Sequence, residues 1–206
     1  MRLKRKARLA ATERRQQLVS VAMRQIAERG FEGLRFQEVA KEAGVNNATL
    51  CYHFPTKEAL IQAVVGQSME ELKKSRHRPK GIPTTAREEL REEFQDLRKL
   101  LRTQPNLFIV LIELSIRGLR DPVISKMDAN RESFWREHLS GIIRRGMEQH
   151  LFHAGIRVQP AVGALMAQFK GIGYHATLGK RKWREVDETI AEIASQVEHW
   201  FVCGTR

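Results

Sequence analysis

The sequence predicts an all-α protein of about nine helices, because apolar residues recur at spacings of three and four along most of the chain. Glycine and proline fall mostly between these periodic segments, where helices can end and begin. No stretch has the long alternation of apolar and polar residues that is typical of a β-strand. With 206 residues, 42% hydrophobic and 29% charged, the chain can bury a core in one domain, or in a small one joined to a larger one.

The first module is expected to contain a group of helices separated by clear stop and start signals. Gly30 is expected to end the first helix, and Gly44 the second. Asn46 and Thr56 precede the third and the fourth, where their side chains can accept free backbone N–H groups. The helices are predicted over residues 12–29, 36–43, 47–53 and 57–72.

Further helices are expected beyond a basic joint at residues 73–83, which is also compatible with a frayed helix end followed by a surface loop. Thr85 and Glu88 have the spacing of a capping box. Asp121 followed by Pro122 supplies a cap and a helix-starting proline. The helices are predicted over residues 85–102, 105–119, 121–150, from 160 onward, and 184–202.

The chain is strongly basic, with 36 lysines and arginines against 24 acidic residues and a net charge of +12. Residues 1–15 hold seven basic residues and one acidic residue, a net charge of +6, whereas residues 16–63 are neutral. A basic arm at residues 1–11, including Arg5 and Arg8, is therefore expected to contact the phosphates of a nucleic acid. The tail alone is equally compatible with a disordered, solubilising terminus.

Cysteine content and hydropathy exclude several other classes of protein. Cys51 and Cys203 are too few for a disulfide scaffold or a cysteine-based zinc site. No apolar run approaches the ~20 residues of a membrane span, and the basic N-terminus lacks the apolar segment of a secretory signal. We therefore expect a protein of the reducing cytoplasm that has no cofactor and no membrane partner.

Residues 12–53 have the arrangement of a DNA-reading unit. A long helix is followed by two short ones that meet at Glu42-Ala-Gly-Val-Asn46, where glycine permits the positive φ of a tight turn. The second short helix would then project into a DNA major groove. Amide, hydroxyl and methyl groups there can contact base edges, while other polar groups can reach phosphates. The residues suited to these contacts are Asn47, Ala48, Thr49, Tyr52, His53 and Lys57.

The same segment resembles the DNA-binding domain of the TetR family of bacterial transcriptional repressors over residues 12–65. The resemblance rests on Ala27-Glu-Arg-Gly-Phe31, Val39-Ala-Lys-Glu-Ala-Gly-Val45 and Thr49-Leu-Cys-Tyr-His-Phe-Pro-Thr-Lys-Glu-Ala-Leu60. The blocks match with no insertions over about 50 residues, and the resemblance covers about a quarter of the chain. The resemblance implies a homodimer with a helix-turn-helix domain and connecting helix over residues 12–72, and an effector-binding and dimerisation domain over residues 84–206.

Carried over by position, the resemblance implies a set of DNA contacts. Cys51 stands where the family usually has a tyrosine that touches bases or phosphates, which puts that contact in doubt. A redox switch there would need an activated thiolate, for which the sequence shows no cause, so packing or a base contact is the preferred interpretation. The implied contact residues are Gln37, Asn47, Ala48, Thr49, Tyr52, His53 and Lys57. The residues expected to form the core beneath them are Phe31, Val39, Leu50 and Phe54.

The last two helices are expected to pair two copies of the chain. The final helix carries a heptad-like apolar seam, which suits packing against a partner helix at a shallow angle. Pairing would double the DNA contacts, each of which discriminates between bases by only ~1–3 kcal/mol. Burial of both apolar stripes within one chain is the alternative. The seam comprises Val186, Ile190, Ile193, Val197 and Trp200.

The middle helices, residues 85–175, are expected from the resemblance to enclose an effector pocket. The candidate lining is mostly apolar and favours a lipophilic or aromatic small molecule, although plain core packing explains each residue as well. Charged residues on these helices are expected to form ordinary surface pairs, as Glu113 and Arg117 would at a spacing of four. Asp128, Glu132 and Arg136 have the same interpretation. The candidates are Phe94, Phe108, Leu111, Ile112, Ser115, Phe134, His138, Phe169 and Tyr174.

Other functions find little support in the sequence. It has no Gly-rich phosphate loop, nucleophile elbow or zinc-hydrolase spacing, so no enzyme is predicted. His150 and His153 could share a metal ion, but they lack acidic neighbours at helical spacing and fit a solvated helix end better. Residues 180–184 combine basic residues with Trp183, a feature of single-strand binding, but more simply form a loop.

The sequence therefore predicts a homodimeric, ligand-responsive DNA-binding regulator, expected to be a repressor of a near-palindromic operator. Ligand binding among the middle helices would tilt the helix near residues 57–72 and change the spacing of the two recognition helices. The alternative function is a non-regulatory, helical nucleic-acid-binding protein that uses its basic arm.

Overall fold

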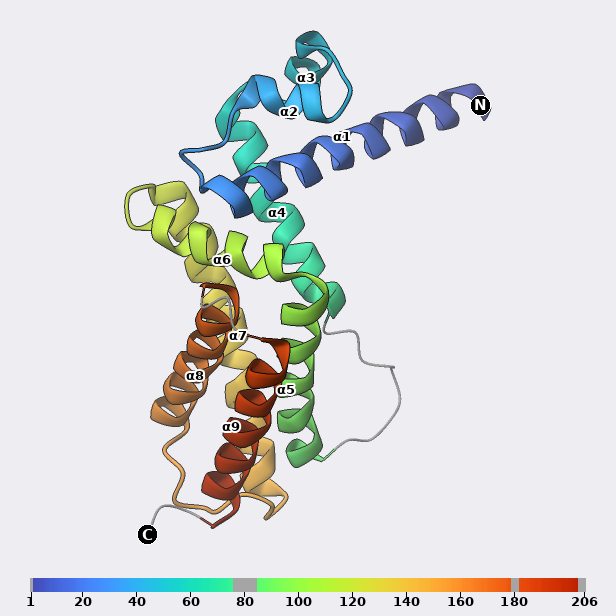
Figure 1. The fold of residues 1–206 in the computed structure, drawn as a ribbon. Helices are drawn as coiled ribbons and strands as arrows, with labels where there is room; N and C mark the ends of the chain where they lie inside the picture. The colour runs from blue at the N-terminus through green and yellow to red at the C-terminus, as the bar shows by residue number, and fades with distance from the viewer. Residues whose placement is uncertain (1, 76–84, 179–181, 204–206) are drawn as a thin grey trace. The chain divides into compact units, whose positions relative to one another are not determined.

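The computed structural model describes residues 2–75, 85–178 and 182–203, and every element within these ranges is an α-helix (Figure 1). The all-α prediction is confirmed. Most of the expected joint lies at residues 76–84, outside the described residues. The helices are α1 (Arg2–Arg29), α2 (Phe36–Glu42), α3 (Asn47–His53), α4 (Lys57–Ser75), α5 (Ala86–Thr103), α6 (Pro105–Gly118), α7 (Pro122–Glu148), α8 (Val158–Leu178) and α9 (Trp183–Cys203).

The chain packs as two compact units that do not follow a single boundary along the sequence. Unit 1 comprises residues 1–73 and 109–127, and unit 2 comprises residues 74–108 and 128–206. Val110, Leu111, Leu114 and Ile124 are buried in the same cluster as the apolar residues of α1 to α4. Helical periodicity shows which face of a helix is buried, but not which of two cores receives it.

In unit 1, α1 begins at Arg2 rather than at Thr12, so the segment expected as a separate arm continues the helix. Its lysines, arginines, leucines and alanines favour helix, and no glycine or proline interrupts them. The first buried side chain described along α1 is Leu18, and residues 11–17 are exposed. The N-terminal half of α1 extends beyond α2, α3 and α4 (Figure 1).

The expected stop and start signals of unit 1 are confirmed. Gly30 and Gly44 have φ of +70° and +66°, a conformation that side chains with a Cβ rarely adopt. Asn46, Thr56 and Asp121 each accept backbone N–H groups from the first turn of the following helix, at 2.8, 3.1 and 3.0–3.2 Å. These caps fix where α3, α4 and α7 begin.

The expected surface pair between Glu113 and Arg117 is not the contact that the structure contains. Glu113 accepts the N–H of Phe31 at 3.4 Å, and Arg117 donates to Glu32 at 2.6 Å. Both side chains of α6 therefore reach the turn that follows α1. The physical reason is that the turn after α1 offers a backbone donor to Glu113 and a carboxylate to Arg117, so each side chain has a partner other than its neighbour on α6.

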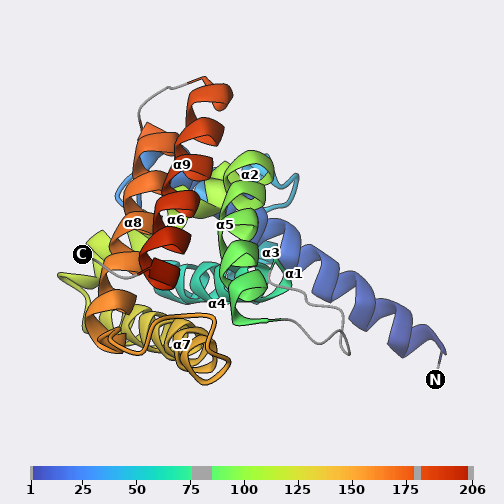
Figure 2. The same ribbon diagram turned by 90° about the horizontal axis from the view of Figure 1, so that it is seen from below.

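Unit 2 is built around α5, α8 and α9, and α9 runs alongside both other helices (Figures 1 and 2). Val186, Ile190 and Val197 of the expected dimer seam are buried in this core, together with the apolar stripe of α8. The alternative interpretation is therefore correct for these stripes, because they are used within the chain. Any interface on α8 and α9 must use their exposed faces.

Ion pairs hold α5 against α9, and a capping box stabilises the start of α5. The capping box of Thr85 and Glu88 is confirmed, with both reciprocal hydrogen bonds present. Arg91 donates to both carboxylate oxygens of Glu198 at 2.7 and 2.8 Å, and Arg87 contacts the same group. These hydrogen bonds hold the pKa of Glu198 below its usual value.

Candidate nucleic-acid interface

The recognition helix α3 is positioned by a tight turn and by its buried face. Gly44 donates to the carbonyl of Lys41 at 3.1 Å and Val45 to that of Ala40 at 2.9 Å, which closes the turn after α2. Leu50 is completely buried and Phe54, just after the end of α3, is almost completely buried, as expected. The opposite face is exposed, and its residues are Asn47, Ala48, Cys51 and Tyr52.

This exposed face has the size and chemistry that a major groove accepts. Tyr52 is 81% exposed, so its ring does not pack beneath the helix. Cys51 is an exposed free thiol. His53 is half-buried and lies edge-on to the Tyr52 ring, 5.2 Å away. Lys57, at the start of α4, is also half-buried, and Gln37, in the first turn of α2, is exposed.

Thr49 has a structural task besides any DNA contact. Both its backbone N–H and its hydroxyl donate to Oδ1 of Asn46, at 2.8 and 2.9 Å. The hydroxyl can therefore accept a hydrogen bond from a base or a water molecule, but it must leave Asn46 before it can donate one to a phosphate. The sequence predicted Asn46 as the N-cap of α3, but it did not predict the second hydrogen bond, which Asn46 accepts from the Thr49 hydroxyl.

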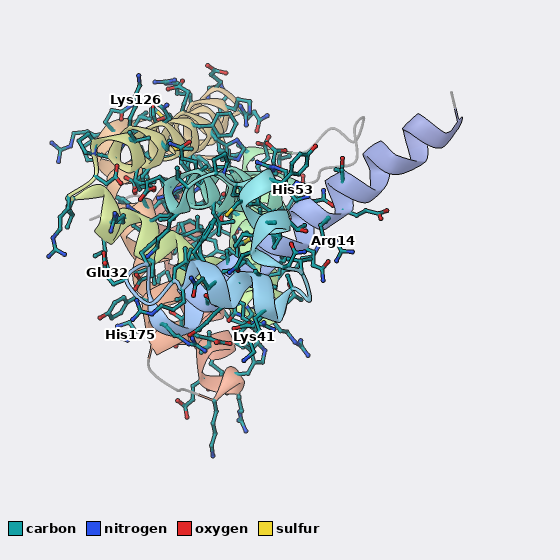
Figure 3. All side chains as sticks on the ribbon, turned by 90° about the horizontal axis from the view of Figure 1, so that it is seen from above. Arg14, Glu32, Lys41, His53, Lys126 and His175 are labelled. Atoms are coloured by element: carbon teal, nitrogen blue, oxygen red, sulfur yellow. The ribbon has the colours of Figure 1, made fainter. Side chains whose placement is uncertain are left out.

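Basic residues of α1 and α2 lie near the recognition helix α3 in unit 1 (Figure 3). Figure 3 looks onto this domain and labels Arg14 of α1, Lys41 of α2 and His53 of α3. Arg15 lies over the ring of Phe54, with its guanidinium carbon 4.9 Å from the ring centroid. Arg5 and Arg8 lie on the helical backbone of α1, and their side chains are outside the described part of the chain. This arrangement gives the exposed face of α3 cationic neighbours for a phosphate backbone.

Sequence reasoning missed the residues that hold α2 on α1. Arg24 and Gln25 both donate to the carboxylate of Glu42, and Arg29 donates to Glu38 at 2.7 Å. The hydrogen bond from Gln25, followed by that from Arg24, holds the pKa of Glu42 below its usual value. The available signal was a glutamine next to Ile26 on the buried stripe of α1, where an apolar residue is usual.

The structure divides the expected effector-lining residues between the two units. Leu111, Ile112 and Ser115 belong to unit 1, and the Ser115 hydroxyl donates to the carbonyl of Leu111 at 3.2 Å. The others belong to unit 2, where Phe134 and Tyr174 are 67% and 54% exposed. Exposure of this size does not suit the lining of an enclosed cavity.

One of the remaining candidates, His138, contacts a buried carboxylate that the sequence analysis did not identify. The rings of Phe94 and Phe169 are 4.6 Å apart, and Trp135 meets Phe169 edge-on at 5.6 Å. Next to them, Glu93 is almost completely buried and contacts His138 Nε2 at 2.8 Å. Trp135 Nε1 donates to the same carboxylate at 3.4 Å. Phe108 packs at Gly173, where an added Cβ would lie only 1.8 Å from the ring.

A separate pocket of about 350 Å³ lies between α8 and α9 in unit 2. It contains none of the expected lining residues. Oε1 of Gln168 is buried there without a hydrogen-bond partner. Its lining includes Gln168, Gly171, His175, Val186, Thr189 and Ile193.

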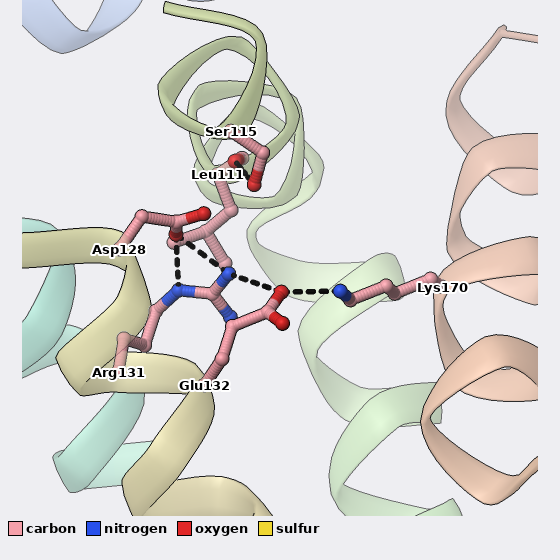
Figure 4. Close-up of polar contacts among 6 residues, drawn as sticks. All are labelled: Leu111, Ser115, Asp128, Arg131, Glu132 and Lys170. Atoms are coloured by element: carbon pink, nitrogen blue, oxygen red, sulfur yellow. Dashed lines mark hydrogen bonds and ion pairs between the residues drawn. The ribbon is translucent and has the colours of Figure 1, made fainter. Parts of the chain in front are cut away.

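A polar network links α7 to α8 in unit 2, where separate surface pairs were expected (Figure 4). Arg131 donates from Nε and Nη2 to one oxygen of Asp128, at 2.9 and 2.7 Å, and both side chains are mostly buried. Glu132 contacts Arg131 at 3.3 Å and also pairs with Lys170. Lys170 lies on α8, which is far from Glu132 in the sequence, so helical spacing alone did not predict this contact.

Two other kinds of site are absent from the described residues. No helix within those residues is both long and apolar enough to cross a membrane. Among the same residues, no group of three histidines, cysteines or carboxylates comes together as metal ligands would.

Comparisons with known proteins match the helix-turn-helix domain most clearly. Residues 18–64 match the family described as "Bacterial regulatory proteins, tetR family". The HTH-type transcriptional regulator RutR of Escherichia coli (strain K12) is 36% identical over 61 residues, which are 30% of this chain and 29% of RutR. UidR of the same strain is 26% identical over 136 residues, 66% of this chain and 67% of UidR. The chain thus spans less than a third of the RutR sequence.

Solved structures share the fold over most of the chain. A TetR transcriptional regulator from Chloroflexus aurantiacus has a TM-score of 0.80 at 14% identity and covers 91% of this chain and 96% of its own. A candidate transcriptional regulator from Saccharomonospora viridis, in complex with choline, has a TM-score of 0.73 at 24% identity, with 93% and 98% covered. Together with the turn and exposed face of α3, the match over residues 18–64 identifies this segment as a helix-turn-helix domain of the tetR family of bacterial regulatory proteins.

Proposed function

We propose that this protein is a homodimeric, sequence-specific regulator of transcription that binds a near-palindromic DNA operator and acts as a repressor. The observation that carries the proposal is the exposed face of α3, held above a buried Leu50 and Phe54 within a TetR-family domain. A helix presented in this way can enter a major groove with its amides, hydroxyls and aromatic ring directed at the duplex.

Base contacts are assigned to Gln37, Asn47, Ala48, Thr49 and Cys51. Phosphate contacts are assigned to Tyr52, His53 and Lys57. The basic N-terminal part of α1, with Arg5 and Arg8, adds phosphate contacts that strengthen binding at low salt. Because α1 is helical from Arg2, this part meets the duplex as a helix rather than as an extended strand.

Dimerisation is proposed through the exposed faces of α8 and α9, because their apolar stripes are already buried within unit 2. Ala164 and Ala167 are exposed on α8, and small side chains allow two helices to approach closely. A dimer is needed because one recognition helix makes too few contacts to select a site, whereas two read both halves of a palindrome.

A small lipophilic or aromatic effector is proposed to bind among the middle helices and to release the operator. The aromatic cluster of Phe94, Trp135 and Phe169 supplies the apolar surface, and His138 with Glu93 supplies polar groups at its edge. The choline-bound structure from S. viridis supports small-molecule binding by proteins of this fold. The effector acts only through a higher affinity for the state that does not bind DNA.

The test is footprinting on duplex DNA from the region upstream of the protein's own gene, at two salt concentrations. A protected near-palindrome that persists at the higher salt supports the regulator. Uniform binding that salt abolishes favours the alternative, a non-regulatory nucleic-acid-binding protein that depends on its charge. Sedimentation of the protein with and without the protected duplex then tests whether two copies bind one site.

A further inference from the structure

Helix α2 is braced by one buried side chain of α1. Gln25 has no exposed surface. Its Oε1 accepts the backbone N–H of Arg35, the N-cap residue of α2, at 3.3 Å. Its Nε2 donates to Oε1 of Glu42, the last residue of α2, at 2.8 Å. A single amide therefore contacts residues at the beginning and at the end of the helix.

The N-terminal end of α2 needs this support because it lacks a cap of its own. Arg35 forms no side-chain cap, and Glu38, from which a capping-box carboxylate would reach back, pairs with Arg29 instead. In a capping box, the side chain at the third helical position accepts the N–H of the N-cap residue. Gln25 makes that bond from a neighbouring helix.

The orientation of α3 follows from that of α2. The two helices are joined by the turn at Gly44, whose hydrogen bonds tie Val45 back to Ala40 of α2. A rotation of α2 on α1 would therefore carry the exposed face of α3 with it. Leu50 anchors α3 through apolar contacts, which tolerate small rotations better than directional hydrogen bonds do.

We propose that Gln25 is a positioning residue for DNA recognition: it locks α2 on α1 and thereby sets the angle at which α3 enters the groove. This inference rests on the proposed function of α3. A leucine or methionine would fill the same volume within the apolar stripe, so the amide contributes its hydrogen bonds rather than its bulk. Fully bonded buried polar groups select one arrangement among several that pack equally well.

The first variant is Gln25→Leu, compared with the wild type on two duplexes. One duplex is selected by the wild-type protein from a random-sequence pool, and the other is its shuffled sequence. We expect affinity for the selected duplex to fall by about tenfold or more, while affinity for the shuffled duplex stays within about twofold, because the phosphate contacts proposed for α1 and for Lys57 of α4 do not depend on the angle of α3. The control is Gln67→Leu, which removes the bond from Gln67 Nε2 to Ser20 Oγ at 3.4 Å and leaves α2 untouched.

A donor–acceptor swap tests the geometry itself. Gln25→Glu places a carboxylate beside that of Glu42 and should lose discrimination between the two duplexes at neutral pH. Adding Glu42→Gln restores a donor opposite an acceptor, while residue 25 still accepts the Arg35 N–H, so the double variant should recover most of the discrimination. If Gln25 affected only stability, the folded fraction of each variant would discriminate between the two duplexes as the wild type does.

A DNA-independent readout separates this proposal from the proposed function. Hydrogen exchange in the Gln25→Leu protein should quicken at residues 36–53 and stay unchanged at residues 18–29. If the wild type selects no duplex, the proposed function fails, and the exchange data alone decide whether Gln25 braces α2. Wild-type discrimination in Gln25→Leu, a double variant no better than Gln25→Glu, or unchanged exchange at residues 36–53 would overturn the positioning role.

Discussion

Arg117, near the end of α6, donates to Glu32 in the turn after α1, with Nη1 and Oε1 2.6 Å apart. One helical turn earlier, Glu113 accepts the N–H of Phe31 at 3.4 Å, beside Gly30. These two contacts hold residues 109–127 on the DNA-binding domain of unit 1. They differ in kind, because one joins two partly exposed charges and the other satisfies a backbone donor of a buried residue.

This difference predicts unequal costs of substitution. Glu32→Ala should change the free energy of unfolding by less than about 1 kcal/mol, because exposed ion pairs contribute little. Glu113→Ala should cost about 1–2 kcal/mol, because the Phe31 N–H is left without its acceptor. The three tryptophans, Trp135, Trp183 and Trp200, all belong to unit 2. Urea unfolding followed by circular dichroism should therefore shift in Glu113→Ala more than unfolding followed by tryptophan fluorescence. Equal costs for the two variants would contradict this assignment.

The DNA surface is tested by removing two of its groups together. Thr49→Ala combined with Lys57→Ala should weaken binding to the protected duplex by about 10- to 100-fold, because the double variant can make neither the direct contact of Thr49 nor the phosphate contact of Lys57. Titration of labelled duplex measures the affinity, and sedimentation checks that assembly is unchanged. The matched control is Lys126→Ala, an exposed lysine of α7. Affinity equal to that of the control would remove α3 from the interface.

Thr49 also permits a finer comparison. Thr49→Ser keeps a hydroxyl that can donate to Asn46, so it should bind DNA nearly as the wild type does, whereas Thr49→Val keeps the shape and removes the hydroxyl. We expect only the valine variant to bind DNA more weakly. If both variants bind equally well, the Thr49 hydroxyl contributes to DNA binding neither directly nor through its hydrogen bond to Asn46.

The basic part of α1 should determine how steeply binding depends on salt. Arg5→Gln with Arg8→Gln keeps the length and helix propensity of the segment and removes two charges. The slope of log affinity against log salt should become shallower by about 0.9 for each phosphate that the segment no longer neutralises. Deletion of residues 2–8 should lower the slope further. An unchanged slope in both variants would mean that this segment does not reach the duplex.

Acid should weaken the contact between α1 and α2. The pKa of Glu42 is lowered in the folded protein by hydrogen bonds from Gln25 and Arg24. A lowered pKa gives stability that is fully present above the unfolded value and is lost as the pH falls through the folded value. Hydrogen exchange at residues 36–42 should therefore quicken as the pH falls below the usual value for a glutamate, after correction for the intrinsic rate. Glu42→Gln should remove that extra pH dependence, and its persistence in this variant would assign it to another group.

Much of the fold and of the candidate interface could be predicted from the amino-acid sequence. Apolar periodicity, capping residues and the glycines at 30 and 44 act locally, so they determined the helices, the turn before α3 and the buried face beneath it. The exposed side of α3 follows from the same period, because residues one turn apart share a face.

Contacts between distant segments were decided only by the tertiary structure. Local pattern predicted a helix over residues 105–119. It did not predict that Val110 and Leu114 join the core of unit 1, or that Glu113 contacts Phe31 instead of Arg117. Local pattern predicted the apolar seam of α9, but it did not predict that α5 and α8 of the same chain cover this seam. The hydrogen bonds of the Gln25 amide to both ends of α2 were likewise visible only in the tertiary structure. The physical reason is that a side chain's own neighbours set its helix and its face, whereas its partner is set by which other surfaces the folded chain brings within reach.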